Sequence, residues 1–241
     1  MRIPRIYTEQ DLHEGLEFDL DDAPSNHIVK VLRMDAGREL ILFNGKGGQY
    51  AATIAATTKK IATIVVGTFT NDNRESPLLS HLAVGISRGD RFDYVLQKAC
   101  ELGVTEITPL FTKRCEVKLN AERLQKRVAA WQKILISACE QCNRNTLPVL
   151  HAPATLINFL PTCTSELKLV LHHRAAKTLS ELSRPASSAI LIGPEGGLAQ
   201  EEIEAAQEHG FQALVLGPRV MRTETAPIVA LGNMQMLWGD F

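Results

Sequence analysis

The sequence lacks the features of a membrane-spanning or exported chain. None of its apolar runs reaches the roughly 20 residues that span a bilayer. The charged start, Met1 to Arg5, is followed by no apolar segment of the kind that a signal peptide contains. We therefore expect a cytoplasmic protein with no membrane partner. The apolar share of 45% is enough to build a packed core.

The five cysteines predict neither a disulfide framework nor a metal site. Their number is odd, and without a signal peptide they are expected to be reduced thiols. Cys139 and Cys142 form a CxxC pair, but neither a second pair nor histidines follow at the spacing of zinc ligands. A redox CxxC usually opens a helix, whereas this pair closes a long helical pattern. We expect no metal ion and no redox site.

A strong excess of one charge is also missing, because the formal net charge is −1. Residues 86–145 do hold 11 lysines and arginines against 7 acidic residues. This mildly basic middle is compatible with nucleic-acid binding. Taken alone, a solvated helix face explains it better.

The first 72 residues are rich in predicted β-structure. A helix is expected to begin at Asp21, because aspartate followed by proline in the first turn marks a helix start. Threonine, valine and isoleucine predict three strands, at residues 39–43, 49–56 and 61–69. The short turns between them favour a compact barrel or sandwich. A polar segment that ends at Pro77 follows, and we place the domain boundary between residues 72 and 73.

From Leu78 onward, strands alternate with helices, which predicts an α/β domain with a mostly parallel sheet. Strands are expected at residues 81–86, 106–111, 167–172, 190–192 and 214–216. Helices are expected at residues 92–103, 121–141, from about 200, and 226–238. The helix over 121–141 has one apolar stripe, which predicts burial in the core or in a subunit interface.

Two loops that follow apolar strands form the candidate ligand site. The first is Gly193–Gly197 and the second begins at Gly217. Ligands of α/β proteins bind at the carboxyl ends of strands, where these loops are expected. The first loop is not GxGxxG and lacks the Lys-Ser/Thr of a P-loop, so a dinucleotide or triphosphate is a poor fit. A plain strand-to-helix connection explains this first loop equally well.

The second loop carries Arg219, Arg222 and Glu224 within six residues. A loop at this place has no structural need for so many charges. They could neutralise one another as a local ion-pair cluster. Their position after a buried strand favours a functional site instead.

Five motifs, in order along nearly the whole chain, resemble one family: MRIPRIY, SRGDRFDYVLQKACELGVTEITPL, CEQCNRN, LIGPEGG and LGPRVMRTETA. This is the ribosomal RNA small-subunit methyltransferase E family, within the SPOUT methyltransferases. The resemblance implies a PUA-like RNA-binding β-barrel over residues 1–72 and a SPOUT domain with a trefoil knot over residues 73–241. It also implies a homodimer that methylates N3 of one uridine, uridine 1498 in the standard numbering, of 16S ribosomal RNA in the small subunit. Pro227 departs from the family pattern, which has a second threonine there, and leaves the start of the last helix open.

The resemblance also implies that S-adenosylmethionine is the cofactor and that backbone groups of three loops hold its adenine. This role explains glycine and small apolar residues in the loops. The residues implied are Leu171, His172, Ile192, Gly193, Pro194, Gly196, Gly197, Leu216, Gly217, Val220, Met221, Thr225 and Ala226.

The chemistry of uracil indicates which side chains the reaction needs. N3 carries a proton at neutral pH and must lose it during methylation, while negative charge spreads onto O2 and O4. Such a site needs a proton acceptor and cationic donors. Glu224 is the candidate acceptor, and Arg222 and Arg219 are the candidates that stabilise the anion. Glu195 is an alternative acceptor, and Glu224 could instead orient Arg222.

Eight basic residues are the candidate phosphate contacts: Arg2, Arg5, Lys30, Arg33, Arg88, Arg91, Arg114 and Arg144. Each could equally be an ordinary surface residue. Two other functions stay open at this point. The chain could be an RNA-binding assembly factor that holds a nucleotide without catalysis, or a SPOUT enzyme with another RNA target.

Overall fold

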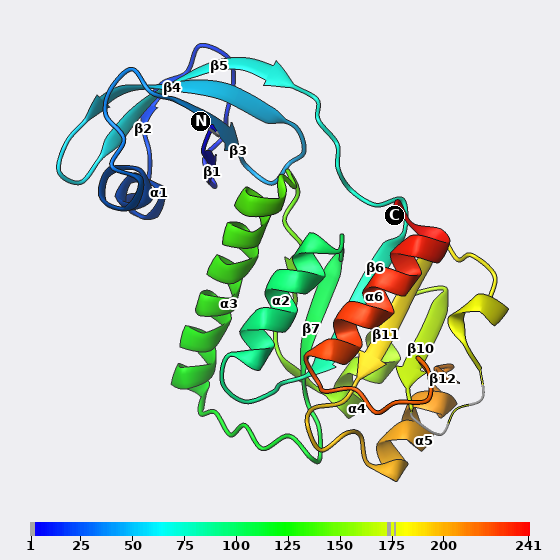
Figure 1. The fold of residues 1–241 in the computed structure, drawn as a ribbon. Coiled ribbons are helices and arrows are strands. Elements are labelled where there is room, and N and C mark those ends of the chain that lie inside the picture. The colour runs from blue at the N-terminus through cyan, green and yellow to red at the C-terminus, as the bar shows by residue number, and fades with distance from the viewer. Residues whose placement is uncertain (1–2, 173–174, 176) are drawn as a thin grey trace. The chain divides into compact units, whose positions relative to one another are not determined.

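The computed structural model describes residues 3–172, 175 and 177–241. Contacts between residues divide the chain into two compact units (Figure 1). The first comprises Met1–Glu75 and Cys139–Leu147, and the second comprises Ser76–Ala138 and Pro148–Phe241. The predicted boundary at residues 72 and 73 stays a prediction, because these units are defined by packing.

The first unit contains a five-stranded sheet with the order β1-β3-β4-β5-β2. Its strands are β1 (Arg5–Tyr7), β2 (Glu17–Asp19), β3 (Glu39–Phe43), β4 (Gln49–Thr57) and β5 (Ala62–Thr70). The three predicted strands are therefore confirmed as β3, β4 and β5, which pair antiparallel. The two remaining strands have three residues each, too few for an alternating pattern to be recognised.

The helix predicted from Asp21 is present but changes type halfway. It begins as α1 (Asp22–Asn26) and continues as a π-helix over His27–Leu32. Arg33 ends it in the left-handed conformation, with φ at 51°. Ile28 is fully buried in the apolar core of this unit, while Val31 is 66% exposed.

The segment after the longest helix belongs to the first unit. That helix, α3, spans Ala121–Cys142. The Arg5 guanidinium donates to the side chain of Asn145 at 2.5 Å and to the carbonyl oxygen of Arg144 at 3.2 Å. Arg144 in turn forms an ion pair with Glu75. Buried guanidinium groups thus attach residues 139–147 to the first unit.

The second unit is built on an all-parallel sheet with the order β12-β10-β11-β6-β7-β8. Its strands are β6 (Leu79–Gly85), β7 (Glu106–Phe111), β8 (Val149–Leu150), β10 (Leu167–Leu171), β11 (Ser187–Ile192) and β12 (Gln212–Leu214), and β9 (Ala154–Thr155) also pairs with β7. This confirms the predicted α/β class with a parallel sheet. The last strand ends at Leu214, two residues earlier than predicted, so Val215 and Leu216 belong to the following loop.

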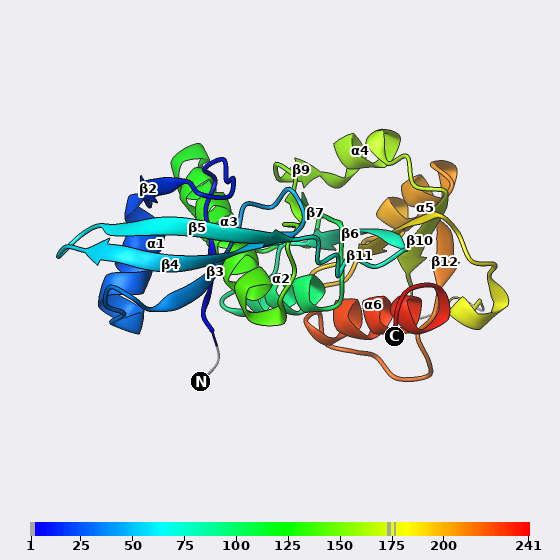
Figure 2. The same cartoon turned by 90° about the horizontal axis from the view of Figure 1, so that it is seen from above.

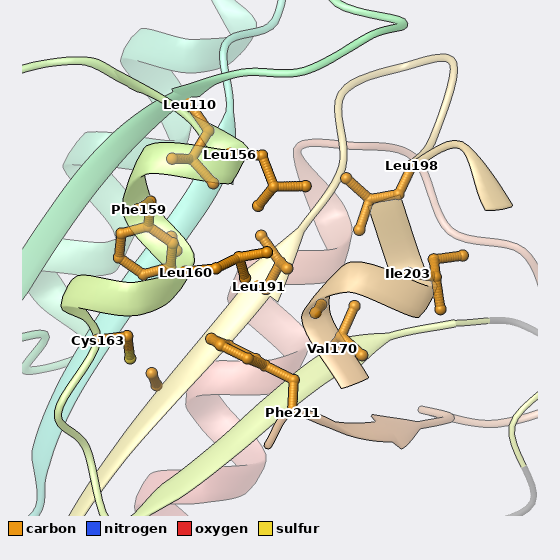
Figure 3. Packing of buried hydrophobic residues seen from close by; sticks show 13 residues of the cluster. Leu110, Leu156, Phe159, Leu160, Cys163, Val170, Leu191, Leu198, Ile203 and Phe211 are labelled. Atoms are coloured by element: carbon orange, nitrogen blue, oxygen red, sulfur yellow. The ribbon is translucent and has the colours of Figure 1, made fainter. Parts of the chain in front are cut away.

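Helices cover both faces of this sheet. They are α2 (Arg91–Glu101), α3, α4 (Leu156–Phe159), α5 (Gln200–Glu208) and α6 (Thr225–Trp238), and 3-10 turns lie at Leu160–Thr162 and Leu179–Glu181. Figure 2 shows α4 and α5 on one face and α2 and α6 on the other. On the first face, Leu191, Val170, Phe159 and Phe211 belong to one buried apolar cluster (Figure 3). No helix in the described part of the chain is long and apolar enough to cross a membrane.

The strand order of the sheet reverses at one position. From β6, the chain adds β7 and β8 on one side, whereas β11, β10 and β12 lie on the other side. The order therefore reverses between β6 and β11. Loops that leave the carboxyl ends of strands at such a reversal diverge and open a crevice.

Candidate functional site

A cavity of about 840 Å³ lies at the carboxyl ends of β10, β11 and β12, within the second unit. The residues predicted from the resemblance to bind the cofactor all line this cavity, with the exception of Thr225. Thr225 is instead the exposed first residue of α6. Arg219, Arg222 and Glu224 line the same cavity. The structure thus brings the predicted loops together, and the roles of their residues stay predictions.

The backbone of the first loop packs closely at Gly193 and leaves no room there for a side chain. A Cβ atom on Gly193 would lie 2.7 Å from the carbonyl carbon of Gly197. A Cβ atom on Gly85, at the end of β6, would lie 2.5 Å from Pro194. Gly217 in the second loop has φ at 123°, a conformation that residues with a Cβ rarely adopt. These glycines are therefore required by close approach and by backbone conformation.

Two side chains, those of Glu202 and Thr223, form hydrogen bonds with backbone groups in and next to the loops. The Oε2 atom of Glu202 accepts the Ala199 N–H at 2.8 Å, and its Oε1 atom accepts the Lys113 N–H at 2.8 Å. Ala199 has no side-chain oxygen to cap α5, so Glu202 makes only half of a capping box. The Thr223 hydroxyl donates to the Gly193 carbonyl at 3.2 Å and links the second loop to the first.

The charged groups at the cavity are arranged differently from the predicted ion-pair cluster. Among the described residues, neither Arg219 nor Arg222 forms an ion pair, and both are exposed. The cation nearest to Glu224 is Arg91, whose Nε atom lies 4.0 Å from Oε2. Arg91 also donates to Glu195 at 3.2 Å. The alternative in which Glu224 orients Arg222 is therefore not seen.

Glu224 carries a buried oxygen that lacks a hydrogen bond. Its Oε2 atom is inaccessible to solvent and has no hydrogen-bond partner among the described residues. A buried acceptor without a donor is costly, and such atoms in native structures call for an explanation. By contrast, Glu195 accepts hydrogen bonds from the Arg88 N–H at 2.9 Å and from Arg91. Of the two candidate proton acceptors, only Glu224 has an unoccupied buried oxygen.

The predicted phosphate contacts fall into different environments. Arg5 and Arg144 are 7% and 4% exposed and donate to groups of their own unit. We do not carry these two into the proposed RNA-contacting set, because their guanidinium groups serve the packing of the first unit. Lys30 and Arg33 are exposed there. Arg2 lies outside the described residues.

The basic residues of the second unit gather near the cavity. The Arg88 side chain pairs with Glu116 at 2.8 Å, and Arg91 and Arg114 line the cavity itself. Arg114 donates to the carbonyl oxygen of Gly196 at 2.9 Å. The sequence placed both arginines in the RNA set without indicating a contact with the two loops. Their position after β6 and β7 was the available indication, because β6 ends beside β11 and β7 ends beside β6.

Two family models match parts of this chain. A family model described as an RNA methyltransferase domain matches residues 74–235, and one described as an RNA methyltransferase PUA domain matches residues 20–67. The ribosomal RNA small subunit methyltransferase E of Buchnera aphidicola subsp. Acyrthosiphon pisum is 36% identical, covering 100% of this chain and 96% of the relative. The Bacillus subtilis protein of the same name is 32% identical, covering 97% of this chain and 96% of the relative.

Two solved structures are similar over 100% of both chains. One is a methyltransferase from Legionella pneumophila in complex with S-adenosylmethionine, with 43% identity and a TM-score of 0.98. The other is a ribosomal RNA small subunit methyltransferase E from Neisseria gonorrhoeae bound to S-adenosylmethionine, with 40% identity and a TM-score of 0.93.

Proposed function

This chain belongs to the ribosomal RNA small subunit methyltransferase E family, and on that premise we propose that it uses S-adenosylmethionine to methylate N3 of a single uridine in 16S ribosomal RNA. The observation that carries the proposal is the buried Oε2 atom of Glu224, which accepts no hydrogen bond, beside a cavity lined by the two loops. Because the proposed substrate is ribosomal RNA, we also propose that the protein acts in the cytoplasm.

The cavity fits the cofactor in size and in the character of its wall. Its volume lies within the range of small-molecule sites, roughly 300–1,000 Å³. Gly193 to Gly197 and Leu216 to Met221 would hold the adenine and ribose through backbone groups, because both segments line the cavity. When bound, the cofactor supplies an electrophilic methyl group on a sulfonium.

Glu224 would accept the proton from N3 of the uracil. The carboxylate comes from the loop between β12 and α6, and its Oε2 atom has no donor that would compete for the lone pairs. A positioned general base of this kind typically contributes about 10²- to 10⁴-fold to a rate.

Arg222 and Arg219 would stabilise the charge that develops on O2 and O4 of the ring. Both residues line the cavity, and neither forms an ion pair with a carboxylate of the described residues. They are therefore available to donate to an incoming base or its phosphate. Both residues are exposed, so an incoming nucleotide would be able to reach them.

Three architectural features complete the proposal. We propose that the SPOUT domain, residues 73–241, contains a trefoil knot, that the sheet of residues 1–72 closes as a PUA-like barrel, and that the protein acts as a homodimer. Membership of the family and the match of residues 20–67 to a PUA domain support them. The exposed Lys30 and Arg33 of the first unit, with Arg88, Arg91 and Arg114 of the second, are the proposed RNA contacts.

Mass mapping of methylated nucleotides in 16S ribosomal RNA tests the proposal directly. RNA from cells that lack the protein should lose one methyl group, at N3 of one uridine, and a plasmid copy of the wild-type chain should restore it. An unchanged methylation pattern would overturn the proposal. Calorimetry with S-adenosylmethionine separates the alternatives, because binding without transfer to small subunits indicates an assembly factor. Loss of a methyl group from another RNA indicates a different target.

A further inference from the structure

Three side chains with metal-binding atoms meet at the opposite end of the sheet from the cavity. They are His81 in β6, Glu106 at the start of β7 and His151 just after β8. One ligand atom of each lies within 4.8 Å of the other two. The cavity lies where strands of this sheet end, whereas His81 and Glu106 lie where their strands begin. The cluster is therefore separate from the proposed methyl-transfer site.

Strand register explains why the three side chains point to the same face. His81 is directly opposite Glu106 in the parallel pair β6–β7, and Glu106 is opposite Val149 in β7–β8. His151 comes two residues after Val149, so its side chain returns to the same face as that of Glu106. The His151 N–H donates to the carbonyl of Ile107 at 2.9 Å, which continues the pairing. Backbone pairing thus fixes the cluster.

The three ligand atoms would need to move only a little to form a common site. His151 Nε2 lies 2.7 Å from Glu106 Oε2, and His81 Nδ1 lies 3.9 Å from the same oxygen. In a tetrahedral zinc site with bonds of about 2.0–2.2 Å, neighbouring ligand atoms are separated by roughly 3.3–3.6 Å. Small side-chain rotations therefore suffice to place all three atoms around one ion.

His81 has the environment of an oriented ligand. Its Nε2 atom lies 2.8 Å from the hydroxyl oxygen of Thr108, a buried residue on the same face of β7. When Nε2 carries the hydrogen and donates it to Thr108, Nδ1 presents its lone pair toward the carboxylate of Glu106. Metal-binding histidines are commonly oriented by such a hydrogen bond from the second ring nitrogen. The Phe159 ring packs against the imidazole in a T-shaped arrangement, with ring centroids 5.4 Å apart, and restricts its rotation further.

We propose that His81, Glu106 and His151 form a binding site for one divalent transition-metal ion, with Zn²⁺ as the reference ion. Two imidazoles and one carboxylate suit zinc, cobalt or nickel better than magnesium or calcium, which prefer oxygen ligands. Three protein ligands leave a position for water. The ion can enter from solvent, because the Glu106 and His151 side chains are 45% and 41% exposed.

Binding of the ion would link separate segments of the second unit. The ion would connect β6 and β7 to the segment that follows β8, a two-residue strand whose Val149 is 53% exposed. Such a connection stabilises the folded second unit, because the unfolded chain lacks a preformed site. This departs from the sequence-based expectation of no metal, because neither histidine is near Glu106 in the sequence.

Cobalt titration of the full chain, freed of metal by a chelator, tests the proposal. We expect one Co²⁺ per chain, displaced by Zn²⁺, with a d–d spectrum of nitrogen and oxygen ligands and no thiolate charge-transfer band. His151→Gln and Glu106→Gln should each weaken the affinity at least tenfold. His13→Gln is the matched control, because it removes an exposed histidine of the first unit. Zn²⁺ should raise the Tm of the wild type and of this control, but not of the two site variants.

Three results would overturn the proposal. One is an absence of stoichiometric cobalt binding by the wild type. Another is a thiolate band, which would assign the ion to cysteine. The third is equal affinity of the wild type and His151→Gln. Circular dichroism of each metal-free variant shows whether it folds, and the two site variants give independent readings because both substituted side chains are partly exposed.

Discussion

Arg91 lies beside Glu224 at the cavity, with its Nε atom 4.0 Å from Oε2 of the carboxylate. The same guanidinium donates to Glu195 at 3.2 Å, so one cation contacts both ligand loops. Arg91 is also the first residue of α2, where the helix dipole disfavours positive charge by about 0.3–1 kcal/mol. An arginine at an unfavourable helix position, facing two carboxylates, is expected to have a role in the site.

Replacement of Glu224 by glutamine should reduce methyl transfer by about 10²- to 10⁴-fold, because the amide keeps the shape but cannot accept the N3 proton. Calorimetric affinity for S-adenosylmethionine should stay at the wild-type value, because the proposed cofactor contacts are backbone groups. Single-turnover transfer to purified small subunits measures the rate. A rate equal to that of the wild type would remove Glu224 as the base.

Replacement of Arg91 by glutamine should slow transfer by roughly 10- to 100-fold, because a misplaced carboxylate no longer meets the base in reacting geometry. Arg127→Gln is the matched control. Arg127 also contacts the start of α2, through Asp93 at 3.0 Å, but does not line the cavity. Single-turnover rates of the two variants should therefore differ. Equal rates would show that Arg91 has no positioning role.

Gly193→Ala should weaken S-adenosylmethionine binding by at least about tenfold, a loss of 1.4 kcal/mol. The new Cβ atom would lie 2.7 Å from the backbone of Gly197, so the loop must move out of the cavity wall. Gly232→Ala is the control, because its Cβ atom would meet no atom within 4 Å and alanine favours a helix by about 0.5–1 kcal/mol. Calorimetry measures the affinity for S-adenosylmethionine, and thermal unfolding measures the stability of each variant. Wild-type affinity of Gly193→Ala would contradict a backbone cradle.

Periodicity predicted the regular elements of the fold well and the irregular ones poorly. The strand expected at residues 106–111 has those bounds in the structure, and the long helix differs by one residue. These elements carry a sustained apolar pattern of one period. The π-helix at His27–Leu32 was not predicted, because the apolar spacing of an α-helix and of this wider helix cannot be distinguished over six residues.

The sequence predicted the local features of the candidate site but not its long-range contacts. The glycines at 193 and 217 are local requirements of the backbone, and the sequence displays them directly. The contact of Arg91 with Glu224 joins residues that are 133 positions apart, and it depends on strand order, which periodicity does not determine. The burial of Arg5 depends on Asn145 in the same way, so a basic residue with a structural role resembled a phosphate contact.

Binding of 16S ribosomal RNA should weaken steeply as salt rises, because each phosphate contact releases counterions. Lys30→Gln combined with Arg33→Gln should reduce the slope of log K against log salt by about 1 for each lost contact. Both side chains are exposed, so the fold should tolerate the change. Filter binding across a salt series gives the slope. A slope unchanged by the double substitution would exclude the two residues as contacts.

Glu140→Gln should stabilise the protein at neutral pH. Burial raises the pKa of Glu140 despite the hydrogen bond from the Tyr7 N–H at 3.0 Å, and glutamine retains that acceptor without a charge. The folded protein binds the Glu140 carboxyl proton more tightly than the unfolded chain does. The buried carboxylate therefore destabilises the fold fully above the raised pKa, and this destabilisation disappears below the ordinary pKa of 4.5.

The Tm of Glu140→Gln should therefore exceed that of the wild type at pH 7. The difference should narrow as the pH falls toward 4.5, where the wild-type carboxyl group becomes protonated. Glu122→Gln on the same helix is the control, because the Glu122 side chain is 73% exposed and forms an ion pair with Lys126 at the helix surface. Its Tm should show no comparable gain at pH 7. A Glu140→Gln advantage that stays constant between pH 7 and pH 4.5 would show that side-chain packing, rather than the buried charge, is the cause.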